Sequence, residues 1–391
     1  MHPQPSFALV RGDERFYREQ LEVAAREMRN SIASGSAIRL YDASTDQLIQ
    51  AIIGLDGHCR RIELVPEGVQ LEPLDDEFQS FDSPTEWVIY TSGSTGTPKA
   101  VVHTLESLSR AVSESDGPRV WGLVYDPHRL AGLAVVLQAL ASDSLLVEAR
   151  NGTITDRVEV MRATSVNALS ATPTLWRQIL QTGRTSGWEL ERITLGGEIS
   201  DQRTLDALAA AFPKARVTHI FAASETGVAF AVGDGREGFP LEYLSTPPRG
   251  IALEVRDNIL WIHNPSSSVA GADGFASTED VVKVSADRVT FVGRASGMVN
   301  VGGTKVFPEQ VERVLRTHPS VTDVVVFSKQ NPFSGSILIA KVTLRGGLSD
   351  ESIAGELRKW VAAKLPTPMV PAQVLVVDQL PSAATGKVVR S

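Results

Sequence analysis

The alternation of strand-forming and helix-forming segments constrains the fold of this chain more than any other feature. Between Thr91 and about Gly293, short apolar segments alternate with segments whose apolar residues recur at helical spacing. The strand segments include SLLVEA, VNALSAT and RITLGG, and the helical ones include VEVMRAT, LWRQILQ and a helix after Ser200 that ends at Pro213. Such alternation is typical of βαβ units. We therefore expect an α/β fold in which largely parallel sheets are layered with helices.

The N-terminal part of the chain carries one clear helical pattern. In DERFYREQLEVAAREMRNSIAS, apolar residues recur near helical spacing from Phe16 to Ile32, through Leu21, Ala24 and Met28. This spacing predicts an amphipathic helix. Polar segments and short strands are expected between this helix and about residue 90.

The pattern changes after FVGR to that of a compact α+β unit. Pro308 suits the first turn of a helix that has Val311 and Leu315 on one face. The segments VTDVVVFS, SILIAKVTL and QVLVVD predict strands, and apolar spacing from Ile353 to Leu365 predicts a second helix. Because this unit has enough apolar faces for a core of its own, we expect a large domain over residues 1–293 and a small one over 298–391.

The segment TSGSTGTPK, from Thr91 to Lys99, concentrates small hydroxyl residues and glycines around one lysine. It fails the Walker pattern, because Pro98 stands where that pattern needs its second glycine. Apolar segments on both sides predict a strand-to-strand connection, and Thr104 suits the N-cap of a helix through LESLSRAVSES. The loop is suited to a polyphosphate, with backbone amides, hydroxyls and Lys99 as donors, but its composition also fits a plain polar hairpin.

Composition excludes several classes of function. The 391 residues carry a net charge of -8, and the chain has no basic run with interleaved aromatic residues, which argues against a nucleic-acid partner. Cys59 is the one cysteine, so an intramolecular disulfide is excluded. The N-terminus lacks a signal-peptide pattern, and the apolar run from Leu130 to Leu137 is far too short to span a membrane. We expect a soluble, cytoplasmic protein, monomeric or homodimeric.

Six motifs follow the order found in the adenylate-forming superfamily of acyl-CoA synthetases, adenylation domains and luciferases. They are YTSGSTGTPK, GGEIS, FAASETG, STED, GRASGMVNVGGTKVFPEQVE and PSAATGK. The chain resembles this superfamily from about Trp87 to its C-terminus. Its short N-terminal region and the segment PHRLAGLAVVLQAL resemble the short o-succinylbenzoate-CoA ligases.

The resemblance implies a two-step reaction. A carboxylate attacks the α-phosphate of ATP to give an acyl-adenylate and pyrophosphate, and a thiol of coenzyme A or of a carrier-protein pantetheine then displaces AMP. Such chemistry needs positive charge on the departing pyrophosphate, Mg2+ and a dry pocket that holds the carboxylate in line. The implied partners are a small carboxylic acid and an acyl carrier protein as a second acceptor.

The resemblance assigns most of the motif residues to ATP. It places Ser224 on the α-phosphate, Phe221 on the adenine, and Asp280 and Arg294 on the ribose. The residues that it places on the β- and γ-phosphates are Thr91, Ser92, Gly93, Thr95, Gly96 and Lys99. Glu225 would bind magnesium, and Lys387 would neutralise charge between the carboxylate and the α-phosphate as the catalytic lysine. The implied ATP-binding residues are Thr91, Ser92, Gly93, Thr95, Gly96, Lys99, Gly197, Glu198, Phe221, Ser224, Asp280 and Arg294.

The acyl pocket is implied to be small and moderately apolar, which suits an aryl or medium-sized acyl acid. His128 matches a family histidine near the acid and is grouped with Lys387 and Glu225 as catalytic, although a lone histidine is more often structural. The candidate lining consists of His128, Leu130, Ser170, Thr172, Gly197, Phe221 and Ala222.

A catalytic lysine on the small domain implies that the two domains must close together and then rotate. The hinge is expected over residues 294–297, with Ser296 where the family usually has Asp or Lys. Gly302 and Gly303 would leave room for pantetheine after rotation. The departures at Phe221, Ala222, Glu279 and Ser296 also motivate a further reading, a degenerate acyl or nucleotide binding module without turnover.

Overall fold

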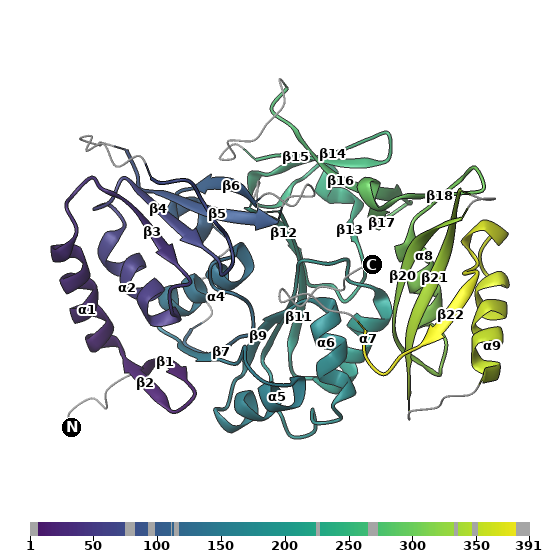
Figure 1. Ribbon diagram of the computed structural model, residues 1–391, viewed down its shortest axis with the longest axis horizontal. Helices are drawn as coiled ribbons and strands as arrows, with labels where there is room; N and C mark the ends of the chain where they lie inside the picture. The colour runs from purple at the N-terminus through teal and green to yellow at the C-terminus, as the bar shows by residue number, and fades with distance from the viewer. Residues whose placement is uncertain are drawn as a thin grey trace.

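The computed structural model describes residues 7–74, 83–92, 98–110, 112, 117–223, 227–264, 273–331, 335–345 and 351–380. Within these residues the strands form five sheets, and helices cover the larger ones (Figure 1). The mixed α/β fold expected from the sequence is confirmed.

The largest sheet is the predicted βαβ sheet. Its central strands β8, β7, β9, β10 and β11 run parallel, and antiparallel pairs close both edges. Helices α4, α5, α6 and α7 connect these strands or follow them. In spatial order the strands are β12 (Gly227–Val232), β11 (Arg216–Ala223), β10 (Arg192–Leu195), β9 (Ala168–Ala171), β7 (Val120–Leu123), β8 (Leu145–Glu148), β1 (Phe7–Arg11) and β2 (Glu14–Tyr17). The helices are α4 (Leu130–Ala141), α5 (Ile154–Ala163), α6 (Pro173–Gln181) and α7 (Gln202–Ala211).

A second, four-stranded sheet precedes it in the chain. Its strands are β3 (Ala37–Tyr41), β4 (Arg61–Val65), β5 (Glu86–Ser92) and β6 (Pro98–His103), with helices α1 (Arg18–Ser31), α2 (Thr45–Leu55) and α3 (Leu105–Ser109) nearby. The predicted N-terminal helix exists but begins at Arg18, because Phe16 lies on β2. Helix α2 was not predicted, although Ser44 and Gln47 form its capping contact and Leu48, Ile49 and Ile52 recur at helical spacing.

Two expectations are wrong, one about the length of a helix and one about the type of a sheet. The helix predicted from Leu105 through LESLSRAVSES is described only as far as Ser109, although its predicted N-cap is confirmed: the Thr104 hydroxyl accepts from the Ser107 amide at 3.1 Å. The βαβ alternation does not continue to Gly293. Residues 239–294 instead form an antiparallel sheet of strands β13 (Phe239–Pro240), β17 (Arg288–Arg294), β16 (Ala276–Val284), β15 (Ile259–His263) and β14 (Ala252–Arg256).

The predicted α+β unit follows a 3₁₀ turn at Ala295–Gly297. It contains a hairpin, a three-stranded sheet and two helices, which pack around their own hydrophobic cluster centred on Val311, Leu315 and Leu357. The elements are β18 (Val299–Val301), β19 (Thr304–Val306), α8 (Pro308–Arg316), β20 (Val321–Asn331), β21 (Gly335–Leu344), α9 (Glu351–Ala362) and β22 (Gln373–Val376).

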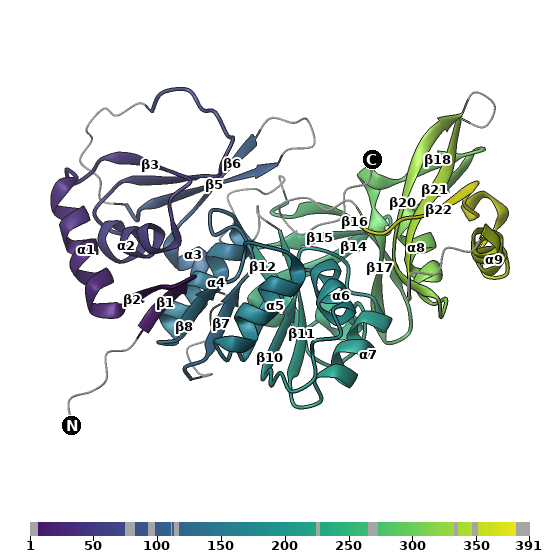
Figure 2. The ribbon, with the colours of Figure 1, turned by 60° about the horizontal axis from the view of Figure 1, so that its bottom comes forward.

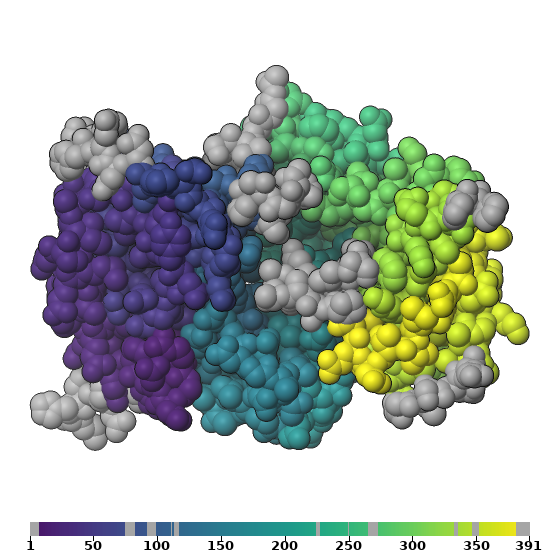
Figure 3. Space-filling view, in the orientation of Figure 1, coloured from purple at the N-terminus to yellow at the C-terminus, as the bar shows by residue number. Residues whose placement is uncertain are grey.

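We call the described residues up to Arg294 the large lobe and those from Val299 the small lobe. The chain runs along the long axis of the molecule, so that the first strands and the small lobe lie at opposite ends (Figures 1 and 3). Figure 2 shows α5, α6 and α7 along the large sheet, with α8, β20 and β21 of the small lobe beyond them. Contacts between α6 and β20 and between α8 and β17 join the two lobes.

Candidate functional site

The carboxyl ends of the parallel strands gather most of the predicted pocket residues. Strand β9 lies between β7 and β10, and β10 lies between β9 and β11, all in parallel register. Parallel strands end at one edge of a sheet, and ligands of open α/β sheets bind at that edge. The residues at or just after these ends are His128, Leu130, Ser170, Thr172, Gly197, Glu198, Phe221 and Ala222.

His128 lies in the turn between β7 and α4 and is 2% exposed. Its Nδ1 lies 2.9 Å from Oδ1 of Asp126, and the same carboxylate oxygen accepts the His128 backbone amide at 2.9 Å. The imidazole Nε2 is buried and has no hydrogen-bond partner among the described residues. A histidine held through Nδ1 presents Nε2 to its surroundings, so this atom is the one placed to meet a ligand.

Asp126 holds this ring in place and is not among the residues predicted from the sequence. Burial would raise the pKa of its carboxyl group, but the hydrogen bonds from His128 and the charge of Arg129 lower the pKa overall. Arg129 Nε lies 3.5 Å from the second carboxylate oxygen of Asp126. The segment YDPH carried the signal, since an Asp two residues before a His reaches both the ring and its backbone amide.

The turns after β9 and β10 both make hydrogen bonds to the first turn of helix α6. Thr172 is the N-cap of this helix, and its hydroxyl accepts from the Leu175 amide at 3.1 Å. The carboxylate of Glu198 accepts from the Thr174 amide at 3.0 Å, at the positive end of the helix dipole. Gly197 has φ +80, a backbone conformation that favours glycine. Thr172 and Glu198, predicted to contact ligands, therefore also have structural partners.

A buried tyrosine lies behind these turns. The Tyr125 hydroxyl hydrogen-bonds Ser170, and the pKa of Tyr125 is raised above its ordinary value by burial and by the charge of Glu198. The neutral phenol therefore persists across the physiological pH range. Tyr125 is also not among the residues predicted from the sequence, because an isolated tyrosine in an apolar segment reads as core.

Phe221 joins the large sheet to the antiparallel sheet. Its ring is stacked with Phe230 at 5.3 Å between centroids and with Phe291 at 5.2 Å. Phe239 packs against both Phe230 and Phe291, so that the four rings form one aromatic cluster. Phe221 thus has a packing role besides the adenine contact predicted for it. Ala222 follows it on β11, opposite Val228.

Asp280 and Arg294 lie directly opposite each other on the paired strands β16 and β17. The Arg294 Nε atom is 3.8 Å from Asp280 Oδ1, and its Nη2 atom is 3.6 Å from Glu279. Burial raises the pKa of Asp280 to about 6, although the charge of Arg294 opposes this shift. The two residues predicted to bind the ribose are therefore neighbours in the folded chain.

The backbone next to Asp280 adopts a conformation that favours glycine, although Glu279 occupies the position. Glu279 has φ +60, in the left-handed region where a side chain is unfavourable. The pairing of β16 with β17 also shifts register nearby, between Val281 and Val282. Glu279 still leaves Asp280 in place opposite Arg294.

The strand-to-strand setting of the TSGSTGTPK segment is confirmed. Strands β5 and β6 pair antiparallel up to Ser92 opposite Pro98, and Thr91 lies opposite Lys99. The Thr91 hydroxyl lies 3.4 Å from the Lys99 carbonyl oxygen, to which it donates. This arrangement differs from a Walker loop, which leads directly into a helix.

A buried carboxylate anchors the strand that carries this segment. The Tyr90 hydroxyl donates to Glu63 at 2.7 Å, and Arg39 and Arg61 form ion pairs with the same carboxylate at 2.7 and 2.8 Å. Burial alone would raise the pKa of Glu63, but these three partners lower it. Burial and Glu63 together raise the pKa of Tyr90 to about 12. The end of β5 is thus fixed next to Thr91.

The predicted hinge lies between the two lobes, and the two glycines expected to leave room for pantetheine lie at the start of the small lobe. Ser296 lies in the 3₁₀ turn between β17 and β18. Gly302 and Gly303 form the two-residue turn of the β18–β19 hairpin, with φ +56 and +86. Positive φ at both positions is the requirement of a type I′ turn, so glycine is favoured by the backbone itself. A Cβ added at either glycine would meet no atom within 4 Å.

Several predicted site residues lie outside the described residues. They are Gly93, Thr95, Gly96, Ser224, Glu225 and Lys387, and only the backbone of Ser92 is described. Glu225 is the predicted magnesium ligand, and the described part of the chain contains no group of three acidic, histidine or cysteine side chains suited to a metal ion. The same part contains no helix long and apolar enough to cross a membrane.

Comparisons with known proteins agree with this arrangement. A family model described as AMP-binding enzyme matches residues 47–258, more than half of the chain, and the model of the AMP-binding enzyme C-terminal domain matches residues 310–387. A probable 2-succinylbenzoate–CoA ligase of Mycobacterium tuberculosis strain H37Rv is 29% identical over 333 residues, which cover 80% of this chain and 85% of that protein.

Solved structures share the fold. A variant of E. coli MenE with bound OSB-AMS has a TM-score of 0.73 at 19% identity and covers 95% of this chain and 91% of its own. The anthranilate CoA ligase AuaEII in complex with anthranoyl-AMP has a TM-score of 0.77 at 15% identity, covering 99% and 93%. The superfamily predicted from the six motifs is confirmed, as is the prediction of an enzyme. This chain belongs to the AMP-binding enzyme family.

Proposed function

We propose that the protein is an AMP-forming acid–thiol ligase, which activates a carboxylic acid with ATP and transfers the acyl group to coenzyme A. Membership of the AMP-binding enzyme family and the similarity to a probable CoA ligase support this function. The carboxylate attacks the α-phosphorus and expels pyrophosphate. The thiol sulfur then attacks the acyl carbon and expels AMP, and the thiol proton is released.

The observation that carries the proposal is the position of Phe221 relative to Arg294. The Phe221 ring is stacked on Phe291, which lies three residues before Arg294 on strand β17. Arg294 in turn lies opposite Asp280 on strand β16. Residues proposed for the adenine and the ribose come from motifs some 60 positions apart in the chain. Their closeness supports one nucleoside site shared by β11, β16 and β17.

The acyl side of the proposed site lies at the ends of β7, β9 and β10. His128 presents a buried Nε2 there, oriented by Asp126, and Tyr125 and Ser170 supply neutral polar groups. A buried site of this kind excludes water from the acyl-adenylate, which would otherwise hydrolyse. We propose that the substrate is an aryl or medium-sized acyl acid, and that His128 contacts its carboxyl group.

The remaining roles rest on the motifs. We propose Thr91 to Lys99 as the pyrophosphate clamp, Glu225 as the magnesium ligand and Lys387 as the catalytic lysine. When bound, magnesium would offset the phosphate charge as pyrophosphate leaves. We also propose residues 294–297 as the hinge between domains 1–293 and 298–391. Because ATP and coenzyme A are the proposed substrates, a cytoplasmic location is proposed too.

A panel of carboxylic acids, scored by pyrophosphate release with and without coenzyme A, tests this function. We expect at least one aryl or medium-chain acid to support release, and coenzyme A to convert stalled adenylate into thioester and AMP. Release without thioester, restored by a pantetheinylated carrier protein, would instead favour the carrier-loading alternative. Nucleotide or acid binding without any pyrophosphate release across the panel would favour a binding module and contradict the ligase.

A further inference from the structure

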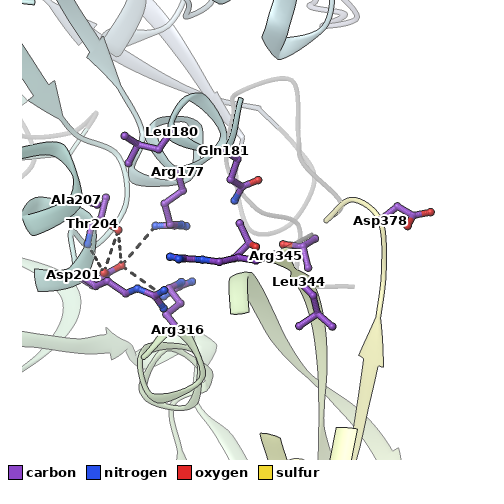
Figure 4. A pocket seen from close by; sticks show the side chains of 13 residues that line it. Arg177, Leu180, Gln181, Asp201, Thr204, Ala207, Arg316, Leu344, Arg345 and Asp378 are labelled. Carbon is purple, nitrogen blue, oxygen red and sulfur yellow. Dashed lines mark hydrogen bonds and ion pairs between the residues drawn. The ribbon is translucent and has the colours of Figure 1, made fainter. Parts of the chain in front are cut away.

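A cavity of about 490 Å³ lies between the two lobes. Helices α6 and α7 of the large lobe form one wall, and α8, β20 and the end of β21 in the small lobe form the other (Figure 4). Its lining is unusually basic, because four arginines and two aspartates reach it. The arginines are Arg177, Arg203, Arg316 and Arg345, and the aspartates are Asp201 and Asp378.

Two of these arginines are already neutralised. Arg177 Nε lies 3.0 Å from Asp323 and its Nη1 lies 3.6 Å from Asp201. Arg316 contacts the same two aspartates at 3.2 and 3.8 Å and Glu312 at 3.2 Å. These carboxylates are all nearly buried. Among the described residues they form ion pairs with Arg177 and Arg316, whereas Arg203 is within reach only of the charges of Asp201 and Asp323.

Arg203 and Arg345 form no ion pair in the part of the chain that the structure describes. Arg203 lies in the first turn of α7 in the large lobe, and its Nη2 atom donates a 3.4 Å hydrogen bond to the Val321 carbonyl oxygen of the small lobe. Its Nη1 atom is buried without a hydrogen-bond partner among the described residues. Burial, followed by the repulsion of Arg345, lowers the pKa of Arg203. Two cationic side chains, one from each lobe, thus lie close together, and neither forms an ion pair with a carboxylate among the described residues.

The surroundings of the two arginines favour an anion. In Figure 4, Arg345 extends across the cavity toward Arg177, whereas Asp378 lies at the far rim and is directed away. The Thr322 hydroxyl also lines the cavity and is buried without a partner among the described residues. Guanidinium groups and a hydroxyl together suit a phosphate oxyanion, because guanidinium binds phosphate through paired hydrogen bonds.

We propose that this cavity binds a phosphate oxyanion between Arg203 of the large lobe and Arg345 of the small lobe, with Thr322 as a further donor. The ligand is inorganic phosphate, pyrophosphate or the phosphate group of a small ester. Because its contacts come from both lobes, it binds the arrangement in which the lobes lie together and favours that arrangement over others. The site is separate from the proposed ligase chemistry and does not depend on it.

Equilibrium dialysis with radiolabelled inorganic phosphate, at constant ionic strength, tests the site. A non-hydrolysable ATP analogue at saturating concentration would occupy the nucleotide site, so that the remaining binding reports on the cavity. We expect one saturable site per chain, at least tenfold weaker in Arg345→Gln and in Arg203→Gln. Arg184→Gln is the matched control, since Arg184 is a half-exposed large-lobe arginine paired with Glu159. Its phosphate affinity should equal that of the wild type.

The outcomes separate the proposal from its alternatives. Saturable binding that persists unchanged in both variants would place the phosphate elsewhere, and no saturable binding would mean that the cavity holds only water. Either result overturns the proposal. Arg345 is exposed, so its variant is expected to fold even if Arg203→Gln does not. Repeating the dialysis with unlabelled pyrophosphate and with coenzyme A as competitors distinguishes the ligand sources.

Discussion

The Nε atom of Arg177 lies 3.0 Å from Oδ1 of Asp323, so that a nearly buried ion pair joins helix α6 of the large lobe to strand β20 of the small lobe. Burial alone would raise the pKa of Asp323, but Arg177 and Arg316 lower it. Asp201 completes the group, since both arginines also face it. Each arginine therefore contacts a carboxylate from both lobes. Buried ion pairs of this kind fix a relative orientation more than they add stability.

Coupling between Arg177 and Asp323 should be measurable. In a double-mutant cycle of Arg177→Ala and Asp323→Ala, we expect a coupling free energy of about 2 kcal/mol, because each single change removes the shortest ion pair of a buried charge and leaves it only its second partner. Urea unfolding followed by tryptophan fluorescence supplies the four free energies of unfolding.

The exposed pair Arg184–Glu159 is the matched control for this cycle. Its shortest distance is 2.7 Å, but both side chains are about half exposed. Water screens such pairs, so its cycle should give less than about 1 kcal/mol. Equal coupling in the two cycles would mean that burial between the lobes adds nothing to the Arg177–Asp323 contact.

Nucleotide affinity should depend on the ionisation of Asp280. Burial raises the pKa of this carboxyl group to about 6, with Arg294 opposing and Glu279 and Glu309 reinforcing the shift. Below that pH the proton is bound, and the group loses its ability to accept from both ribose hydroxyls. We expect the dissociation constant for ATP to rise as the pH falls from 7 to 5.

Asp280→Asn provides the reference for this titration, because the amide has no ionisation in this range. Its affinity should be lower at pH 7 and should follow only the ionisation of ATP itself. Isothermal titration calorimetry at several pH values gives both profiles. Parallel profiles for the two proteins would show that Asp280 does not contact the nucleotide.

Asp126 is expected to act through His128. Replacing the side chain in Asp126→Ala removes the acceptor that holds Nδ1 and leaves the ring free to turn. We expect the kcat/KM for acid-dependent pyrophosphate exchange to fall at least about tenfold, or roughly 1.4 kcal/mol. When the Asp126 substitution is added to the His128→Ala variant, we expect almost no further loss of kcat/KM. Arg129→Gln, which removes the other charged neighbour of Asp126, should have little effect.

The parallel core was predictable because each strand and helix carries its own periodic signal. Segments such as SLLVEA and LWRQILQ became β8 and α6 with small shifts of their ends. The antiparallel sheet of β13 to β17 was not predictable in this way, because its pairing depends on contacts distant in sequence, such as Phe239 with Val289. The three-stranded sheet and both helices of the α+β unit were predicted, since its core is local, but the β18–β19 hairpin was not.

The candidate site shows the same division. Motifs supplied Asp280 and Arg294, and the strand register places them opposite each other. They did not supply Asp126, Tyr125 or the charged group around Asp323. These residues act through partners that only folding brings together, as Arg177 and Asp323 do from 146 positions apart. A carboxylate on a strand is otherwise indistinguishable from one that faces water.

Lys387 is predicted to serve adenylation alone. In Lys387→Ala we expect acid-dependent pyrophosphate exchange to be lost, because the charge between the carboxylate and the α-phosphate is no longer neutralised. A preformed acyl-adenylate should still be converted into thioester. Lys359→Ala, on α9 of the same lobe, is the control and should leave both half-reactions intact. Unchanged exchange in Lys387→Ala would contradict the assignment.

The β18–β19 turn is predicted to serve the thiol step alone. Gly303 has φ +86, and a Cβ there meets no neighbour in the described arrangement, so bulk at this position should not disturb adenylation. In Gly303→Trp we expect pyrophosphate exchange to persist and thioester formation to fail, because the ring would block pantetheine when the small lobe turns. Gly303→Ala carries the same backbone strain, about 1 kcal/mol, without the bulk and should retain both steps. Thioester formation by the tryptophan variant would mean that the thiol reaches the adenylate by a route that avoids this turn.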